Sequence, residues 1–181
     1  MKCNNNLVLQ ILEKEHLSDI IKTFIFPWTT LKATTEKWEQ YYQDQEIGNR
    51  TVCIAKIDNQ LIGYGTLIKD SKYPFFKIAH IPEINDVRIL EEYQGRGFGK
   101  QLIQYLENIA LIEQYQEIGI GVGLYKDYGN AQKLYVRMGY VPDGNGITYN
   151  YQQVTPGSSY TLDDDLIIWL KKDLGKNRIA T

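Results

Sequence analysis

The segment "EEYQGRGFGKQL", residues 91–102, concentrates glycine and positive charge immediately before an amphipathic helical pattern. The first N–H groups of a helix lack partners within the helix, and the helix dipole makes that end partly positive. Glycine has no side chain to keep an anion away from the backbone, and Arg96 and Lys100 add positive charge. The segment is therefore well suited to bind a pyrophosphate.

The common nucleotide-binding patterns do not fit this segment. The dinucleotide fingerprint needs a third glycine where Lys100 stands, and the P-loop needs a glycine at Gln94 and a Ser or Thr at Gln101. The glycine loop of protein kinases lies between strands rather than at a helix start. The pattern that does fit is Q/R-x-x-G-x-G/A, which is met by Gln94, Gly97 and Gly99.

In two segments the chain resembles the GNAT superfamily of acyl-CoA-dependent N-acyltransferases. The first is the glycine pattern, preceded by the strand-like "VRIL" and followed by a long amphipathic helix. The second is "AQKLYVRMGY", residues 131–140, which is similar to a family signature in which Ala leads to "LY" and then to "GY" or "GF". The resemblance covers the element order from about Leu7 to Leu170. It implies that acetyl-CoA is the co-substrate and that its thioester is attacked directly by a primary amine.

The resemblance also implies which residues bind the coenzyme. The pyrophosphate would lie on the glycine loop, and the pantetheine arm would pair with the preceding strand like an added strand edge. The family's usual asparagine contact falls at Tyr128, so either Asn130 replaces it or the contact is lost. Asn130 could instead cap the helix. The implied coenzyme residues are Val87, Ile89, Leu90, Gln94, Gly95, Arg96, Gly97, Phe98, Gly99, Lys100 and Asn130.

Amine attack on a thioester needs a group that accepts a proton and a donor for the departing thiolate. The family often uses the tyrosine of "LY" as that donor, which implies Tyr135; the alternative is a core aromatic. Glu83 lies eleven residues before Gln94, where many members of the family carry a glutamate, so the resemblance makes it the first candidate base; the alternative is a solvated strand-edge residue. Asp86 is the second candidate, and a water chain without a dedicated base is the third.

The resemblance places the acceptor site against three segments, near residues 25–38, 78–86 and 140–165. Five aromatic residues there are candidates for the pocket wall or for ordinary packing: Phe26, Trp28, Tyr149, Tyr151 and Tyr160. The acidic run Asp163, Asp164 and Asp165 is either a solvated turn or an attraction for a cationic amine, such as a polyamine, an aminoglycoside or lysine. We therefore expect a small and cationic acceptor. The alternatives are a protein lysine or N-terminal acetyltransferase, or a non-catalytic acyl-CoA-binding regulatory module.

Hydrophobic periodicity predicts the elements that must position these residues. Thr35 is expected as a helix cap and Gly139 as a helix end. The three strand signals after residue 140 could yield two strands. The expected elements are a strand at 7–12, helices at 16–26 and 34–45, a hairpin at 50–70, a strand at 83–90, a helix at 97–114, a strand at 117–124, a helix at 130–139 and strands within 140–154 and 166–170.

This order predicts an α/β fold with a mixed, mostly antiparallel central sheet of about seven strands and helices on both faces, the acyl-CoA N-acyltransferase fold. No linker or repeat divides the chain, so residues 1–181 are expected to form a single GNAT-like acetyltransferase domain.

Composition is ordinary for a globular protein, with 43% hydrophobic and 23% charged residues and a net charge of −2. That charge favours neither nucleic acid nor an anionic membrane as a partner. The chain lacks the apolar core of a signal peptide and the roughly 20-residue apolar run of a membrane span, so a cytoplasmic protein is expected. A homodimer is an open expectation, because family members are often dimers.

The two cysteines and two histidines suggest no further chemistry. Cys3 and Cys53 do not make a disulfide framework, and Cys53 within "TVCIAKI" is expected in the core. His16 and His80 have no Cys or His partner at metal-binding spacing, so no metal is expected.

Overall fold

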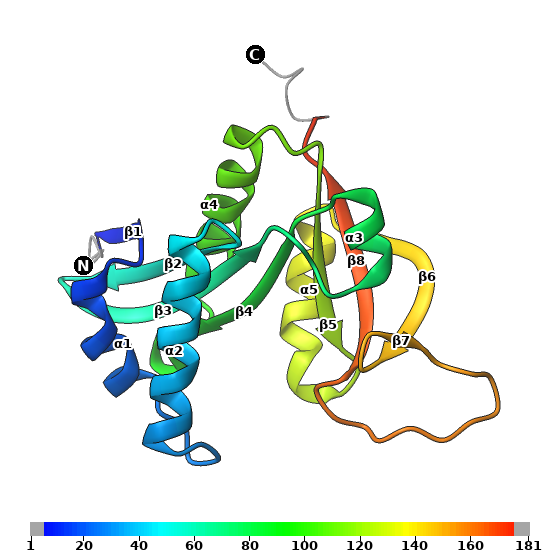
Figure 1. Ribbon diagram of the computed structural model, residues 1–181, viewed down its shortest axis with the longest axis horizontal. Helices are drawn as coiled ribbons and strands as arrows, with labels where there is room; N and C mark the ends of the chain where they lie inside the picture. The colour runs from blue at the N-terminus through cyan, green and yellow to red at the C-terminus, as the bar shows by residue number, and fades with distance from the viewer. Residues whose placement is uncertain (1–5, 176–181) are drawn as a thin grey trace. The chain divides into compact units, whose positions relative to one another are not determined.

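The computed structural model describes residues 6–175. Its eight strands are hydrogen-bonded in the order β1-β2-β3-β4-β5-β8-β6-β7 (Figure 1). β4 and β5 run parallel, whereas the other registered pairs are antiparallel. The predicted mixed, mostly antiparallel sheet is confirmed, with eight strands in place of about seven.

The chain folds into two compact units. Unit 1 comprises the described residues 6–68 and 86–106, and unit 2 comprises 69–85 and 107–175. The division falls within β4 (Glu83–Ile89), so this strand gives its first residues to unit 2 and the rest to unit 1. The expected single domain stays a prediction, and each unit is described by itself below.

Unit 1 is built on an antiparallel hairpin. The turn of the predicted hairpin lies at Asp58 and Asn59, whose φ angles of 49° and 63° fit the tight turn that matches the twist of paired strands. The short 3-10 segment η1 (Lys14–His16) leads into the first helix. The other elements of unit 1 are β1 (Leu7–Ile11), α1 (Leu17–Thr23), α2 (Leu31–Glu46), β2 (Arg50–Ile57), β3 (Gln60–Ile68), η2 (Glu91–Tyr93) and the first residues of α4 (Phe98–Ile112).

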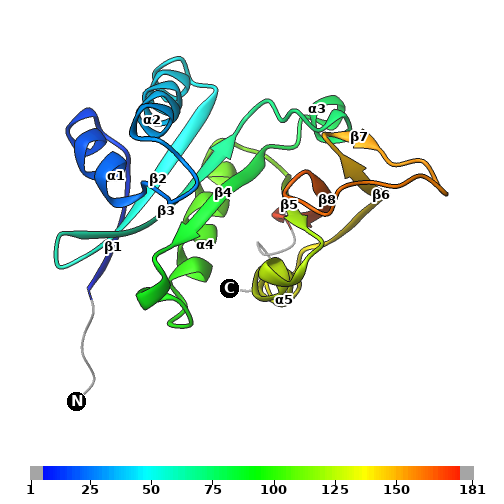
Figure 2. The ribbon, with the colours of Figure 1, turned by 90° about the horizontal axis from the view of Figure 1, so that it is seen from below.

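Helices cover both faces of the unit 1 strands. Figure 2 shows α1 and α2 on one face and α4 on the other. On the α1–α2 face, the rings of Phe24 and Trp38 each meet the Tyr64 ring edge-on, with centroids 4.7 Å apart. On the α4 face, a Cβ added at Gly65 would lie 3.2 Å from Leu106. The core of unit 1 therefore has an aromatic side and an aliphatic side.

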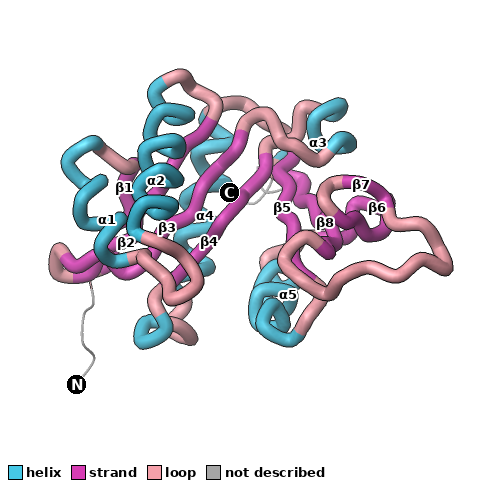
Figure 3. Tube along the Cα trace, turned by 60° about the horizontal axis from the view of Figure 1, so that its bottom comes forward, coloured by secondary structure: helices cyan, strands magenta, loops and turns pink. Residues whose placement is uncertain are grey.

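Unit 2 contains the remaining helices and strands. Seven registered pairs join β5 to β8, from Glu117↔Asp173 to Gly123↔Ile167. Residues 154–165 form the long loop between β7 and β8, drawn pink in Figure 3. The elements of unit 2 are α3 (Pro74–Ala79), β5 (Glu117–Gly123), η3 (Lys126–Tyr128), α5 (Gly129–Arg137), β6 (Val141–Tyr149), β7 (Gln152–Gln153) and β8 (Leu166–Asp173).

An aromatic cluster fills the core of unit 2. The rings of Tyr73 and Trp169 are stacked with centroids 4.3 Å apart, and Phe76 meets both rings edge-on. The indole N–H of Trp169 donates to the hydroxyl of Thr148 at 2.8 Å, so its one polar group is satisfied. Gly119 in β5 lies directly under the ring of Phe76.

Most predicted elements are confirmed, and the differences have local causes. α3 was not predicted, because its six residues are too few to show a helical period; Pro74 at its first position and the burial of Phe76 define it. Thr35 is not a cap: α2 begins at Leu31, and the hydroxyl of Thr30 accepts from the N–H of Ala33 at 3.1 Å.

Three further outcomes concern single residues and the C-terminal strands. Asn130 is not a cap, since Tyr128 holds the N-cap position of α5. The signals after residue 140 form three strands, because the two-residue β7 pairs with β6. Cys53 is buried as expected, and Cys3 lies outside the described residues. Among residues 6–175, every helix is too short or too polar to cross a membrane.

Replacing Gly119 with alanine should destabilise the protein. A Cβ there falls within overlap distance of three atoms of the Phe76 ring, which Tyr73 and Trp169 hold in place. We expect Gly119→Ala to lower the free energy of unfolding by about 1–3 kcal/mol in urea titrations. Gly129→Ala is the matched control, because open space surrounds that position at the start of α5. Equal stability of the two variants would contradict the close packing.

Candidate functional site

The glycine loop before α4 exposes its backbone. Gly95 and Gly97 have φ angles of +74° and +87°, a region that glycine enters without strain. Within residues 6–175, no backbone carbonyl accepts from the N–H groups of residues 95–97. These groups precede the first turn of α4, whose own N–H groups lack partners inside the helix. The loop therefore offers a run of N–H donors to an anion.

Two side chains fix this loop to the rest of unit 1. Phe98 is buried among apolar residues of β2 and β3, including Ile57 and Ile62, so its contribution to an anion site is through the backbone. The amide of Gln94 donates to the carbonyl of Ile89 at 3.0 Å, which joins the loop to the end of β4. The guanidinium carbon of Arg96 lies 5.4 Å from the Tyr93 ring centroid, at the loop itself. All the predicted pyrophosphate residues thus come together in unit 1.

β4 contains a left-handed residue, Asp86. Its registered pairs with β5 are at Glu83 and Ile84, and Asp86 then takes a φ of +50°. This left-handed conformation costs a residue with a side chain roughly 1–2 kcal/mol. Beyond Asp86, Val87 contacts the α4 side at Gly65, whereas Leu90 packs in the α1–α2 core. The predicted pantetheine residues therefore follow the left-handed residue of this strand.

The carboxylate of Asp86 is held by three donors from unit 1. The ammonium of Lys37 lies 2.6 Å from one oxygen, and the hydroxyls of Tyr41 and Tyr64 donate at 3.1 Å each. Lys37 Nζ also lies 5.3 Å from the ring centroids of Trp38, Tyr41 and Tyr64. Burial and the nearby Asp86 charge raise the pKa of Tyr64, so its hydroxyl remains a donor. This arrangement suits an anchor for β4 better than a general base.

Glu83, the first candidate base, belongs to unit 2 and is 2% exposed. The hydroxyl of Ser71 donates to one of its oxygens at 2.6 Å, and the amide of Asn85 donates to the other at 2.9 Å. Ser71 in turn accepts from the N–H of Tyr73 at 3.0 Å, which fixes the serine. The carboxylate is thus oriented by neighbours that a strand-edge residue in solvent would not have. Neither Ser71 nor Asn85 was predicted, because nothing in the sequence links a loop serine to this strand.

Tyr135, the predicted acid, is buried in α5 of unit 2. Burial raises the pKa of Tyr135 to about 12, so the phenol stays protonated across the neutral range. Asn130 lies in the same helix and is exposed. Unit 2 therefore carries both Glu83 and Tyr135. Gln132, which the sequence did not single out, donates from its amide to the carbonyl of Gly123 at 2.7 Å and joins α5 to β5.

The acidic run in the β7–β8 loop accepts hydrogen bonds from tyrosines. The hydroxyl of Tyr149 donates to Asp163 at 3.0 Å, and those of Tyr125 and Tyr128 both donate to Asp164. Desolvation and this bond to Asp164 raise the pKa of Tyr128. These contacts order the loop against η3 and β6. The run is therefore not a plain solvated turn, which was one of the two interpretations of the sequence. Its attraction for a cationic acceptor stays a prediction.

The five aromatic residues that are candidates for the wall of the acceptor pocket lie in separate groups. In unit 1, Phe26 and Trp28 are stacked with centroids 4.9 Å apart and planes within 4° of parallel. In unit 2, Tyr149 and Tyr160 are 5.6 Å apart, and Tyr151 packs against Trp169. Trp28 is 71% exposed, so packing alone does not account for its position.

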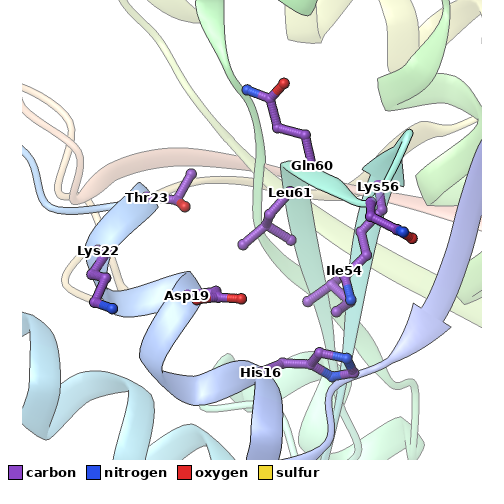
Figure 4. A pocket seen from close by; sticks show the side chains of 9 residues that line it. His16, Asp19, Lys22, Thr23, Ile54, Lys56, Gln60 and Leu61 are labelled. Carbon is purple, nitrogen blue, oxygen red and sulfur yellow. The ribbon is translucent and has the colours of Figure 1, made fainter.

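A pocket of about 260 Å³ lies between α1 and the β2–β3 hairpin, apart from every predicted site residue (Figure 4). Its lining mixes acidic, basic and apolar side chains: His16, Asp19, Lys22, Thr23, Ile54, Lys56, Asn59, Gln60 and Leu61.

Among the described residues, Glu13, Glu15 and His16 bring possible metal-ligand atoms within 4.8 Å of one another. Nδ1 of His16 accepts from the N–H of Glu13 at 3.0 Å and Nε2 faces the amide of Gln10, so both ring nitrogens have protein partners.

Comparisons with known proteins agree with this geometry. The model of the acetyltransferase (GNAT) family matches residues 15–140. No curated protein sequence matches the chain. Among solved structures, spermidine N-acetyltransferase from Vibrio cholerae in complex with CoA and spermine has a TM-score of 0.67 and 20% identity, covering 96% of this chain and 98% of that one.

Two other solved structures have the same fold at low identity. The acetyltransferase yncA from Salmonella typhimurium, solved with its cofactor acetyl-CoA, has a TM-score of 0.64 and 16% identity over 93% of this chain and 94% of that one. A GNAT-family acetyltransferase from Desulfovibrio desulfuricans has a TM-score of 0.67 and 10% identity over 93% and 99%. At these identities the structures support the fold and not the substrate.

The backbone strain at Asp86 can be tested by two substitutions. Asparagine tolerates positive φ better than alanine does, while both remove the charge that faces Lys37. We expect Asp86→Ala to lower the free energy of unfolding by about 1 kcal/mol more than Asp86→Asn, measured by urea denaturation. The control is the same pair of changes at Asp58, an exposed turn residue with a φ of 49°. Equal losses for the two Asp86 variants would exclude a strained backbone there.

Proposed function

The chain belongs to the GNAT acetyltransferase family, and on that premise we propose that it transfers the acetyl group of acetyl-CoA to the primary amine of a small, cationic molecule. The observation that carries the proposal is the glycine loop, with unpaired N–H groups and positive φ angles at Gly95 and Gly97, at the start of α4. Such a loop suits a pyrophosphate because it combines open donors with a positive helix end.

The coenzyme would bind along unit 1. The pyrophosphate would accept from the N–H groups of residues 95–100, with Arg96 and Lys100 supplying charge. The pantetheine amides would pair with the backbone of Val87–Leu90, as an extended peptide pairs with a strand edge. Asn130, exposed in the first turn of α5, is proposed as a further coenzyme contact.

The proposed reaction is a direct transfer. The neutral amine attacks the thioester carbonyl carbon, a C–N bond forms, the C–S bond breaks, and the thiolate leaves. Tyr135 donates a hydrogen bond to that thiolate. Its pKa of about 12 exceeds that of an ordinary thiol near 8.5, so full proton transfer requires that burial also raise the basicity of the thiolate. Glu83 is proposed to accept the amine proton through water, since its carboxylate is 2% exposed.

Coenzyme binding can be tested at Gly97. A side chain at its φ of +87° is strained and stands among the donors of the loop. We expect Gly97→Ala to raise the Kd for acetyl-CoA roughly tenfold or more in isothermal titration calorimetry, because tenfold corresponds to about 1.4 kcal/mol. Gly48→Ala is the matched control: its φ is +80° and no atom lies within 4 Å of the added Cβ, so the backbone strain is alike. Equal Kd changes in both variants would remove the loop from the coenzyme site.

Turnover can be tested at Tyr135. With acetyl-CoA and a panel of primary amines, we expect thiol release by the wild type and a loss of about 100-fold in kcat for Tyr135→Phe, with little change in the KM for acetyl-CoA. Because the pKa of Tyr135 is about 12 rather than the ordinary 10, kcat should not fall between pH 8 and pH 10 through its ionisation. Tyr140→Phe is the control, since that ring is also buried and lies 6.1 Å from Tyr135.

The panel also separates the alternatives. Spermidine and peptides with a free N-terminus are included because solved structures of the same fold are a spermidine N-acetyltransferase and an α-N-protein acetyltransferase, and lysine peptides test the remaining protein alternative. Acetyl-CoA binding without thiol release from any amine or peptide would favour a non-catalytic acyl-CoA-binding role.

A further inference from the structure

The side chain of Arg88, on β4, lies against two aromatic rings. Its guanidinium carbon lies 4.4 Å from the Phe26 ring centroid and 5.9 Å from that of Trp28, on the α1–α2 side of unit 1. The residue is exposed, and within residues 6–175 it forms no ion pair with a carboxylate. A guanidinium held on aromatic rings keeps its N–H edge available, because stacking uses only the face of the group.

The ring pair under Arg88 is ordered by its own loop. The hydroxyl of Thr29 accepts from the N–H of Phe26 at 3.2 Å and contacts the carbonyl of the same residue at 3.1 Å. Thr29 also lies within hydrogen-bond distance, 3.1 Å, of the Thr34 hydroxyl in α2. Phe26 is thereby fixed between α1 and α2, and Trp28 stacks on it. The platform is built before any ligand arrives, so a ligand of Arg88 avoids much of the entropic cost of ordering the side chain.

The carboxylate next to Arg88 on β4 is already paired. The carboxylate nearest to it along the strand, Asp86, already faces the Lys37 ammonium at 2.6 Å and two tyrosine hydroxyls. Asp86 is therefore not available to a second ammonium, and within residues 6–175 no carboxylate forms an ion pair with Arg88. A polyamine, which has no acidic group, would meet net repulsion there.

We propose that Arg88 binds an acidic group, a carboxylate or a phosphate, carried by the acceptor amine, so that the acceptor is an amino acid or amino phosphate rather than a plain polyamine. The inference rests on the proposed acetyl transfer and changes its acceptor from a plain cationic amine to an amine that also carries an acidic group. Arg88 lies within Val87–Leu90, the stretch assigned to the pantetheine arm. An acceptor bound on the α1–α2 face of that stretch therefore reaches Arg88. The planar guanidinium binds carboxylate and phosphate through two parallel N–H···O bonds.

The test compares amines that differ only in the acidic group. The pairs are ornithine and putrescine, lysine and cadaverine, and phosphoethanolamine and ethanolamine; the last pair separates phosphate from carboxylate. In thiol-release assays we expect the acidic member of at least one pair to have the higher kcat/KM. Arg88→Gln should reduce kcat/KM for that member roughly 10- to 100-fold, mainly through KM, and leave its partner unchanged or improved. Arg88→Lys should recover only part of the loss, because lysine lacks the fork.

Other outcomes would overturn the proposal. A wild-type preference for the non-acidic member of every pair would do so, as would equal losses for both members in Arg88→Gln. A raised Kd for acetyl-CoA in that variant would instead place Arg88 on a coenzyme phosphate. Arg137→Gln, which removes an exposed arginine at the end of α5, is the control and should change neither quantity.

A binding measurement separates this proposal from the proposed reaction. Trp28 is 71% exposed and belongs to the platform, so its fluorescence should respond to ornithine or phosphoethanolamine more than to putrescine or ethanolamine. Loss of the fluorescence change in the Trp28→Phe variant would show that the change comes from Trp28. If no amine releases thiol but the acidic ligands still bind in an Arg88-dependent manner, the acetyl transfer fails and the anion site stands. If amines release thiol but the acidic member of no pair is preferred, the acetyl transfer stands and the anion site fails.

Discussion

The anchoring of β4 at Asp86 is the constraint on which the candidate site depends. The strand pairs with β5 through Glu83 and Ile84, takes a left-handed conformation at Asp86, and then continues as part of unit 1. The contacts of the Asp86 carboxylate with one ammonium and two phenols offset the cost of that conformation. All three partners come from α2 and β3, so the aromatic core of unit 1 and the left-handed conformation at Asp86 stabilise each other. Val87–Leu90 and the glycine loop follow directly from this anchored point.

Glycine has two different physical roles in this chain. In the loop before α4, Gly95 and Gly97 have open surroundings and positive φ angles, so what they provide is backbone conformation and exposed N–H groups. In β5, Gly119 has extended backbone and no free space, because the ring of Phe76 occupies the place of a side chain. A glycine inside a strand often marks a position that another group approaches closely. For Gly119 the group that approaches is a phenyl ring of the protein's own core.

Burial controls protonation at the tyrosines near the candidate chemistry. Tyr135 keeps its proton because a phenolate would be desolvated in the core. Tyr64 keeps its proton for the same reason, reinforced by the negative charge of Asp86. Glu83 differs, since its carboxylate is buried together with the hydroxyl and amide that donate to it. These three groups follow one rule: a polar group withdrawn from water has a hydrogen-bond partner or remains neutral.

The sequence by itself determined the family, the order of the main elements and the anion-binding character of residues 94–100. Those properties are local: the loop follows from glycine spacing and a helix start, and the hairpin from the β-branched runs on either side of Asp58 and Asn59. Only the tertiary structure decided what each polar side chain faces. Asp86 meets Lys37 across 49 positions of sequence, and Arg88 meets Phe26 across 62, pairings that no local pattern encodes. α3 was missed for the same reason, because a six-residue helix is stabilised by the packing of Phe76 rather than by its own period.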